Sequence, residues 1–280
     1  MSKVLQRLLT FFIGIPLVIG IIMFKPYNHL LLNIVITTFA LLSSIELHNM
    51  LSTQSKLFPK WLTCFFVLLF PILCWVFTSL NIDMILTIWV FVFEIIILMG
   101  IECFTQKTFE DSAKKISFTT LILFYVGFMP TLISYITYIP NKSTQYLIMF
   151  FTIVFMTDSF AWLFGVLFGK NNQGIIAASP KKSVAGFIGG VLATLLCSLL
   201  FKVIFPECVE GPVYKLLILT FMTCCGAIIG DLIESVIKRS CNIKDSGNLI
   251  PGRGGVLDSI DSIIIAGPVF YLFLYFFYLV

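Results

Sequence analysis

The stretch QYLIMFFTIVFMTDSFAWLFGVLF, residues 145–168, is apolar almost throughout and carries one charged side chain, Asp158. A helix needs about 20 mostly apolar residues to cross the hydrocarbon core of a bilayer. The stretch is long enough to do so. It therefore predicts a membrane-spanning helix and indicates the fold class of the chain.

Similar apolar runs fill the rest of the chain, which is 59% hydrophobic and 11% charged, with a mean hydropathy of +1.04. Soluble domains carry about 25% charged residues. We expect an all-α polytopic membrane protein with about nine transmembrane helices. The predicted spans are residues 8–24, 30–47, 61–80, 84–100, 117–138, 145–168, 184–205, 213–237 and 260–280. The first run lacks a convincing cleavage site, so we interpret it as a span rather than a signal peptide.

The basic residues indicate the orientation of these spans. With a cytoplasmic N-terminus, 14 of the 18 Lys and Arg residues fall on the cytoplasmic side. The other four are Lys25, Lys142, Lys202 and Lys215. This bias follows the positive-inside rule. The net charge of +4 is thus explained by topology and by anionic lipid headgroups, and no nucleic-acid partner is expected.

The two halves of the chain differ in character. Residues 1–140 are predicted to form a scaffold of lipid-facing or dimerising helices, in which acids such as Glu46, Glu94 and Glu102 occur singly. Residues 141–280 combine glycines, paired acids and lysine clusters at the ends of spans, so we expect them to carry the catalytic motifs. The eight cysteines lie mostly in apolar runs and include no CxxC pair, which indicates small core residues rather than a zinc site.

The first candidate block is TDSFAWLFGVLFGK, residues 157–170. Asp158, Gly165 and Gly169 share one helical face, because they are spaced by seven and four residues. The glycines favour close contact with another helix. An ionised group within a span costs at least about 2.5 kcal/mol, so Asp158 is expected to pair, bind an ion or line a polar cavity.

The second block is the following loop, KNNQGIIAASPKKSVAGFIGG, residues 170–190. Ser179, Lys181 and Lys182 precede the next predicted span. Unpaired N–H groups at a helix N-terminus beside lysines can hold phosphate. Lysines at this place are also ordinary determinants of topology, and both interpretations stay open.

The third block is GDLIESVIKRSCNIKDSGNLIPGRGGVLDSIDS, residues 230–262. Helical spacing places two acids, Asp231 and Glu234, on one face with Ser235 and Lys238. A glycine-rich turn then leads to Asp258 and Asp261. Mg²⁺ binds one or two protein carboxylates and leaves other positions to substrate phosphates. The block therefore indicates a Mg²⁺ site for a nucleotide polyphosphate.

The three blocks together resemble the motifs of the phosphatidate cytidylyltransferases, the CDP-diacylglycerol synthases. The resemblance covers about residues 155–262 and is most specific in the third block. It implies a helical membrane fold, a homodimer and a Mg²⁺-dependent site open to the cytoplasm and the bilayer. It also implies transfer of the CMP moiety of CTP to phosphatidic acid, with release of pyrophosphate. The short chain favours a bacterial protein, so we expect a multi-pass protein of the cell inner membrane whose site faces the cytoplasm.

The same resemblance implies roles for individual residues. Asp231 and Asp258 match the acids that hold Mg²⁺. The remaining catalytic positions are Lys238, Arg239, Lys244, Asp245 and Asp261, and the substrate-binding positions are Asp158, Ser179, Lys181, Lys182, Ser235, Gly254 and Gly255. The chain departs from the family pattern at Arg253 and Ser259, where His and Arg are usual. The acid pair is unaffected by these two departures.

Three alternatives remain to be weighed against this prediction. An ion-coupled transporter would place its acids near the middle of the bilayer, whereas these lie near the ends of predicted spans. A CDP-alcohol phosphatidyltransferase would resemble its family through a DGxxAR block, which the sequence lacks. A catalytically inactive relative is the third alternative, because of residues 253 and 259.

Overall fold

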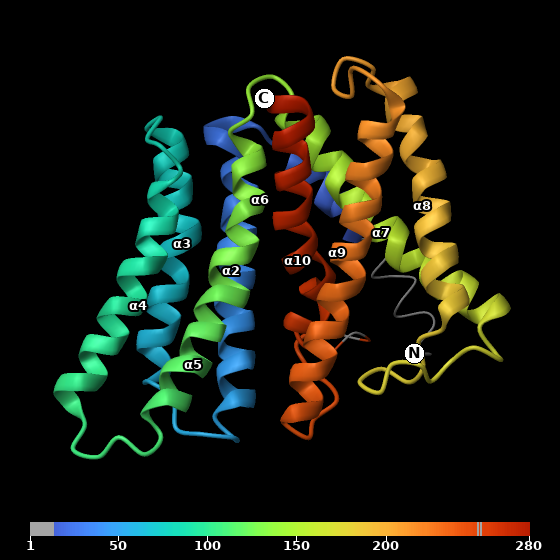
Figure 1. Ribbon diagram of the computed structural model, residues 1–280. Coiled ribbons are helices and arrows are strands. Elements are labelled where there is room, and N and C mark those ends of the chain that lie inside the picture. The colour runs from blue at the N-terminus through green and yellow to red at the C-terminus, as the bar shows by residue number, and fades with distance from the viewer. Residues whose placement is uncertain (1–13, 251, 253) are drawn as a thin grey trace. The chain divides into compact units, whose positions relative to one another are not determined.

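A computed structural model describes residues 14–250, 252 and 254–280, and these are arranged as helices joined by short connections (Figure 1). Eight helical segments of the described chain are long and apolar enough to cross a membrane. They are Pro26–Leu51, Lys60–Ser79, Leu86–Thr105, Ser112–Thr137, Ser143–Phe168, Val184–Ile204, Val213–Ser240 and Leu257–Leu279. The protein is thus an all-α polytopic membrane protein, as predicted.

These eight segments match the last eight predicted spans in order. The first predicted span, residues 8–24, begins outside the described residues, as do Lys3 and Arg7 on which its orientation rests. Its described part is the helix Gly14–Met23. Hydropathy therefore located each long helix that the described residues contain.

The chain divides into two compact units, which are described separately. The first comprises residues 1–138 and 240–259, and the second residues 139–239 and 260–280. The loop that follows the eighth predicted span thus packs with the N-terminal helices. The roles predicted for residues 1–140 and 141–280 stay predictions.

The first unit contains α2 (Pro26–Leu51), α3 (Lys60–Ser79), α4 (Leu86–Thr105) and the span α5–η1–α6. In that span, Ser112–Ile122 and Met129–Thr137 are α-helical, and Leu123–Phe128 forms a π-helical segment between them. Gly127 admits the Phe70 ring at this segment, since a Cβ atom there would lie 2.8 Å from the ring. Phe70 also contacts Phe91 and Phe128, so aromatic side chains form much of this interior.

The start of α2 departs from regular geometry. Tyr27, Asn28 and His29 have positive φ angles of 54°. Regular helix therefore begins at Leu30, the first residue of the predicted span.

The second unit contains α7 (Ser143–Phe168), α8 (Val184–Ile204), α9 (Val213–Ser240) and most of α10 (Leu257–Leu274), which ends in η2 (Tyr275–Leu279). Helices α7 and α8 pack closely through small residues. A Cβ atom on Gly186 would lie 2.6 Å from Ala161 O and 3.4 Å from Gly165 Cα. The close helix contact predicted for the glycine face of α7 is confirmed.

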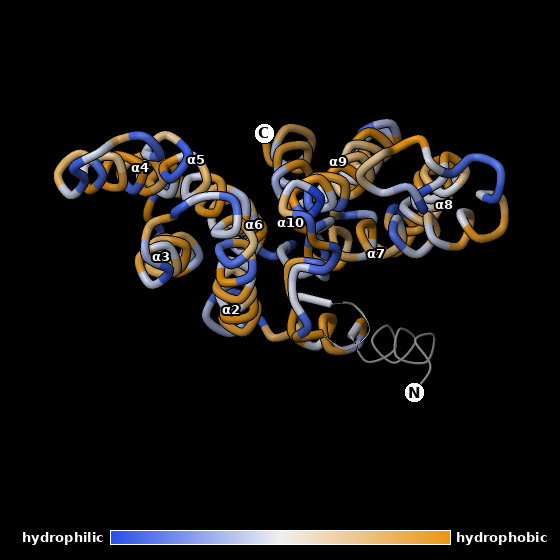
Figure 2. Tube along the Cα trace, turned by 90° about the horizontal axis from the view of Figure 1, so that it is seen from below, coloured by the Kyte–Doolittle hydropathy of each residue, from blue (hydrophilic) through white to orange (hydrophobic). Residues whose placement is uncertain are grey.

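Polar residues gather at the connections between helices. In Figure 2 the helices are mainly hydrophobic, and the hydrophilic segments lie largely in the loops. At one end of the second unit Lys142 donates to Glu207 O, and at the other Arg239 Nε donates to Ala178 O at 3.3 Å. The α6–α7 and α8–α9 connections therefore share one end of this unit, and the α7–α8 loop shares the other with the end of α9.

Candidate active site

The last three turns of α9, in the second unit, carry four of the predicted site residues. Lys238 forms an ion pair with Glu234, whose side chain is fully buried. Ser235 is also buried beside Glu234 on the helix. Removing one partner of a buried ion pair leaves the other charge uncompensated. Lys238 therefore has a structural partner in addition to any substrate it contacts.

The loop between α7 and α8 reaches the same end of α9. Lys182 forms an ion pair with Asp231, and Arg239 bonds the backbone of Ala178. Both side chains of the Lys182–Asp231 pair are partly exposed, at 22% and 32%. This pair can therefore exchange partners more readily than the buried Glu234–Lys238 pair.

The rest of this loop leads into α8 through a side-chain cap. Ser183 Oγ accepts a hydrogen bond of 3.1 Å from Gly186 N and so satisfies a free N–H group of the first turn. Within the loop, Gly174 N donates to the carbonyl of Pro180 at 2.9 Å. Lys181 is exposed and Ser179 is half-buried. The first three N–H groups of α8 are thus bonded to Asn172 and Ser183, so they are not the unpaired groups that the phosphate interpretation expected.

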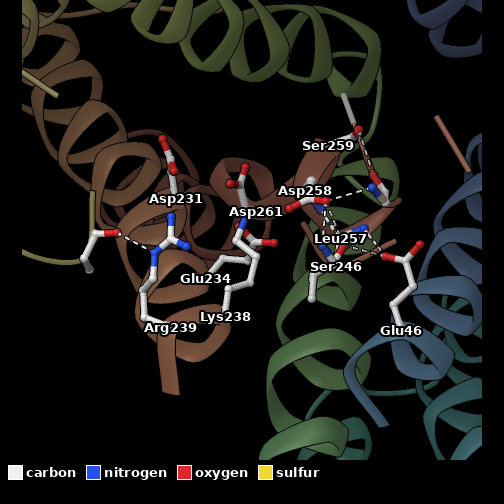
Figure 3. Close-up of polar contacts among 12 residues, drawn as sticks. Glu46, Asp231, Glu234, Lys238, Arg239, Ser246, Leu257, Asp258, Ser259 and Asp261 are labelled. Carbon is white, nitrogen blue, oxygen red and sulfur yellow. Dashed lines mark hydrogen bonds and ion pairs between the residues drawn. The ribbon is translucent and has the colours of Figure 1, made fainter. Parts of the chain in front are cut away.

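Helix α10 brings another acid to this cluster. Asp261 lies close enough to Asp231, Glu234 and Asp158 for their charges to interact, and Ser262 Oγ lies 3.4 Å from Asp158 Oδ1. Figure 3 shows Asp231, Glu234 and Asp261 beside Lys238. Carboxylates from α7, α9 and α10 therefore meet in the second unit, close to Lys182 and Lys238.

Glycines of α9 make this meeting possible. A Cβ atom on Gly230 would lie 2.4 Å from Asp261 O, and one on Gly226 would lie 3.2 Å from Ala266 Cα. Any larger residue at position 230 would push the two helices apart. The sequence analysis did not use this pair, although glycines spaced by four residues are a known signal for close packing in membranes.

The loop of the first unit, residues 240–259, holds Asp258 at the start of α10. Asp258 Oδ2 accepts hydrogen bonds from Ser246 N, Ser246 Oγ and Gly255 N at 2.8, 3.0 and 2.7 Å. Gly254 has a φ of +109°, and a Cβ atom there would lie 2.6 Å from the same oxygen. The glycines predicted to bind substrate are thus also the backbone that surrounds Asp258.

Other predicted residues of this loop are more open. Lys244 and Asp245 are exposed. Ser259 Oγ donates to Gly255 O at 3.2 Å, within the first turn of α10. Arg253 and the neighbouring Pro251 lie outside the described residues.

Glu46 was missed by the sequence analysis. This residue of α2 is 6% exposed, and its carboxylate contacts the loop of residues 240–259 (Figure 3). The available signal was the cost of an acid in an apolar span. A single acid with no motif around it gave no indication of its partner.

The acids are suited to Mg²⁺ in their chemistry, because Mg²⁺ binds carboxylate oxygen atoms. Four carboxylates near one another would also repel without compensating positive charge. Among the residues the structure describes, no three His, Cys, Asp or Glu side chains are placed to hold a metal ion together. One or two carboxylates suffice for Mg²⁺. The predicted pair takes Asp231 from the second unit and Asp258 from the first, and it stays a prediction.

Comparison with known proteins gives one family match over residues 5–277, to the family described as the cytidylyltransferase family. A phosphatidate cytidylyltransferase of Bacillus subtilis is 31% identical over 182 residues, which is 65% of this chain and 66% of the relative. One from Haemophilus influenzae is 37% identical over 165 residues, 58% of this chain and 57% of the relative. One from Staphylococcus saprophyticus is 36% identical over 145 residues, 51% and 52% of the two chains. The matches thus span between about half and two thirds of these relatives.

Proposed function

Since this chain belongs to the cytidylyltransferase family, we propose that it transfers the CMP moiety of CTP to phosphatidic acid, forming CDP-diacylglycerol and pyrophosphate for phospholipid synthesis. The observation that carries the proposal is the cluster of carboxylates with Lys182 and Lys238 at one end of the second unit. A nucleoside triphosphate bound with a divalent cation needs carboxylates for the cation and basic side chains for the phosphate groups in the same site. The names of the similar relatives supply the lipid substrate.

The proposed reaction is a nucleotidyl transfer in one displacement. A phosphate oxygen of phosphatidic acid forms a bond to the α-phosphorus of CTP, and the bond from that phosphorus to the bridging oxygen of the β-phosphate breaks. Pyrophosphate leaves with the bridging oxygen and the electron pair. Such a reaction asks the protein for positioning and charge stabilisation and needs no covalent nucleophile.

The basic residues are suited to the phosphate groups. Lys182 is partly exposed in its pair with Asp231 and can turn from that carboxylate to a phosphate. Arg239 and Lys244 are exposed near the ends of the loops. We assign Lys182, Lys238, Arg239 and Lys244 to the triphosphate and the lipid phosphate.

Mg²⁺ is the proposed cofactor, and Asp231 and Asp258 are the residues that would hold it. When bound, the ion would neutralise charge on the phosphates. Ser246 and Gly255 orient the Asp258 carboxylate toward a fixed direction through their hydrogen bonds. Asp158 and Asp261 complete the acidic cluster of the second unit.

The site is proposed to face the cytoplasm from a multi-pass protein of the inner membrane. Its supporting observation is the gathering of Lys170, Lys181, Lys182, Lys238 and Arg239 around the α7–α8 loop and the end of α9. Positive residues of this kind favour the cytoplasmic side. A homodimer is part of the proposal through the family resemblance alone.

The proposal is tested by purifying the full chain in detergent and supplying CTP, phosphatidic acid and Mg²⁺. We expect CDP-diacylglycerol and pyrophosphate in equal amounts, and loss of both products when EDTA removes the divalent cations. Restored activity on adding excess Mg²⁺ is the control for damage by the chelator. Absence of product under varied detergent and salt would contradict the proposal and favour an inactive relative.

A further inference from the structure

Glu46 connects α2 to the loop of residues 240–259 through three hydrogen bonds. Its Oε1 accepts a hydrogen bond from Val256 N at 2.9 Å. Its Oε2 accepts from Leu257 N at 2.9 Å and from Ser246 Oγ at 2.8 Å. Both carboxylate oxygens are thus used, although the two segments are about 200 residues apart in the chain.

The position of Glu46 suits the start of α10. This helix begins at Leu257, and the first N–H groups of a helix have no partner within it. A carboxylate there both accepts their hydrogen bonds and interacts favourably with the helix dipole. Glu46 therefore caps α10 with a side chain that another helix supplies.

Ser246 connects this cap to Asp258. Its hydroxyl group lies 2.8 Å from Glu46 Oε2 and 3.0 Å from Asp258 Oδ2. A hydroxyl has one proton to donate, so it bonds one carboxylate at a time. Both carboxylates lie within hydrogen-bond distance of this one hydroxyl group, so a displacement of Glu46 changes the donor that is available to Asp258.

Two glycines of the loop leave room for the Glu46 carboxylate. A Cβ atom on Gly255 would lie 2.4 Å from Glu46 Oε2, and one on Gly247 would lie 2.6 Å from Glu46 Oε1. The same Cβ on Gly255 would lie 2.1 Å from Ser246 Oγ. The close fit at both glycines indicates a specific contact rather than an incidental one.

We infer that Glu46 is a positioning residue of the proposed reaction, which fixes the start of α10 and orients Asp258 through Ser246. The inference rests on the proposed function for its effect on catalysis. Glu46 contacts neither substrate nor metal in this role. Replacing Glu46 should therefore raise the Mg²⁺ concentration that turnover requires and speed hydrogen exchange in the loop, even when the helices remain folded.

The first test measures hydrogen exchange at the backbone of residues 240–257 in the full-length protein, without nucleotide or metal. Glu46→Gln replaces one acceptor oxygen by an NH₂ group that faces N–H donors. Val256 N and Leu257 N bond different oxygens of Glu46, so we expect at least one of these two amides to exchange at least about tenfold faster, because it loses its acceptor. Glu94→Gln is the matched control, since Glu94 is 3% exposed on α4 of the same unit. It should leave exchange in the loop unchanged.

The second test measures turnover against Mg²⁺ concentration. For Glu46→Gln we expect the Mg²⁺ concentration at half-maximal rate to rise roughly 10- to 100-fold, as for other residues that orient metal ligands. The KM for phosphatidic acid should change little. Ser246→Ala keeps both carboxylates and removes the hydroxyl group that they share. It should also raise the Mg²⁺ concentration at half-maximal rate. This variant replaces Glu46→Gln in the test if Glu46→Gln does not fold.

The outcomes separate this inference from the proposed function. Unchanged loop exchange and an unchanged Mg²⁺ response in Glu46→Gln would overturn the inference, whether or not the protein transfers CMP. If the wild-type protein forms no CDP-diacylglycerol, faster exchange confined to the loop in Glu46→Gln would support the anchoring role of Glu46 and contradict the proposed reaction.

Discussion

At the scale of single residues, Asp258 is the acid whose surroundings are best defined. Its Oδ2 accepts hydrogen bonds from Ser246 N and Gly255 N and lies 3.0 Å from the Ser246 hydroxyl, whose proton it shares with Glu46. These donors hold the carboxylate in one orientation. A carboxylate held in one orientation is suited to binding a metal ion or another specific ligand.

Asp258→Asn should therefore abolish turnover while the protein is still made and inserted into the membrane. We expect a loss of at least about 100-fold, comparable to removal of one preorganised charged group from an active site. The measurement is the rate of CDP-diacylglycerol formation by protein purified to the same degree as the wild type. Activity within a few-fold of the wild type would show that Asp258 does not hold the metal.

The sequence identified most residues of the candidate site, and the reason lies in their grouping. Asp231, Lys238 and Asp258 belong to one continuous block in which acids and bases are unusually dense for an apolar chain. Glu46 stands alone in an apolar helix, and its partners lie about 200 residues away. Such a contact depends on how the helices pack, which hydropathy and helical spacing do not specify.

At the scale of helices, the close approach of α9 and α10 decides whether the acids of the second unit meet. Gly230 permits that approach, because a Cβ atom there would lie 2.4 Å from the backbone of Asp261. The contact is between main chains, so a side chain cannot rotate away to relieve it.

Gly230→Ala is expected to reduce both activity and thermal stability. Overpacking of this kind costs about 1–3 kcal/mol in the free energy of unfolding. Gly100→Ala on α4 is the control, because nothing lies within 4 Å of its Cβ position. The measurements are the unfolding temperature and the CMP-transfer rate of both variants in the same detergent. Equal behaviour of the two variants would contradict the importance of the α9–α10 contact.

The sequence predicted the positions of the helices more accurately than the irregularities within them. Long apolar runs gave each described span, and Ser183 caps α8 where the predicted span begins. The π-helical segment Leu123–Phe128 was not predicted. Within it, Phe70 packs against Gly127, and this tertiary contact has no local sequence signal.

At the scale of the whole molecule, the distribution of basic residues predicts one orientation in the membrane. The connections after α2, α4 and α7 should lie in the cytoplasm, and those after α6 and α8 on the opposite side. Fusion of green fluorescent protein after Gln106 should give fluorescent cells, and fusion of alkaline phosphatase after Asn141 should give active phosphatase. The reverse pattern would contradict the cytoplasmic placement of the site.

The most direct test of the central claim follows the phosphate groups of CTP in the purified protein. CTP labelled at the α-phosphate is supplied with phosphatidic acid and Mg²⁺, and a second sample carries the label at the γ-phosphate. We expect the α-label to enter the lipid fraction as CDP-diacylglycerol and the γ-label to appear in pyrophosphate. An α-label that stays in water-soluble CMP, CDP or unreacted CTP would contradict it.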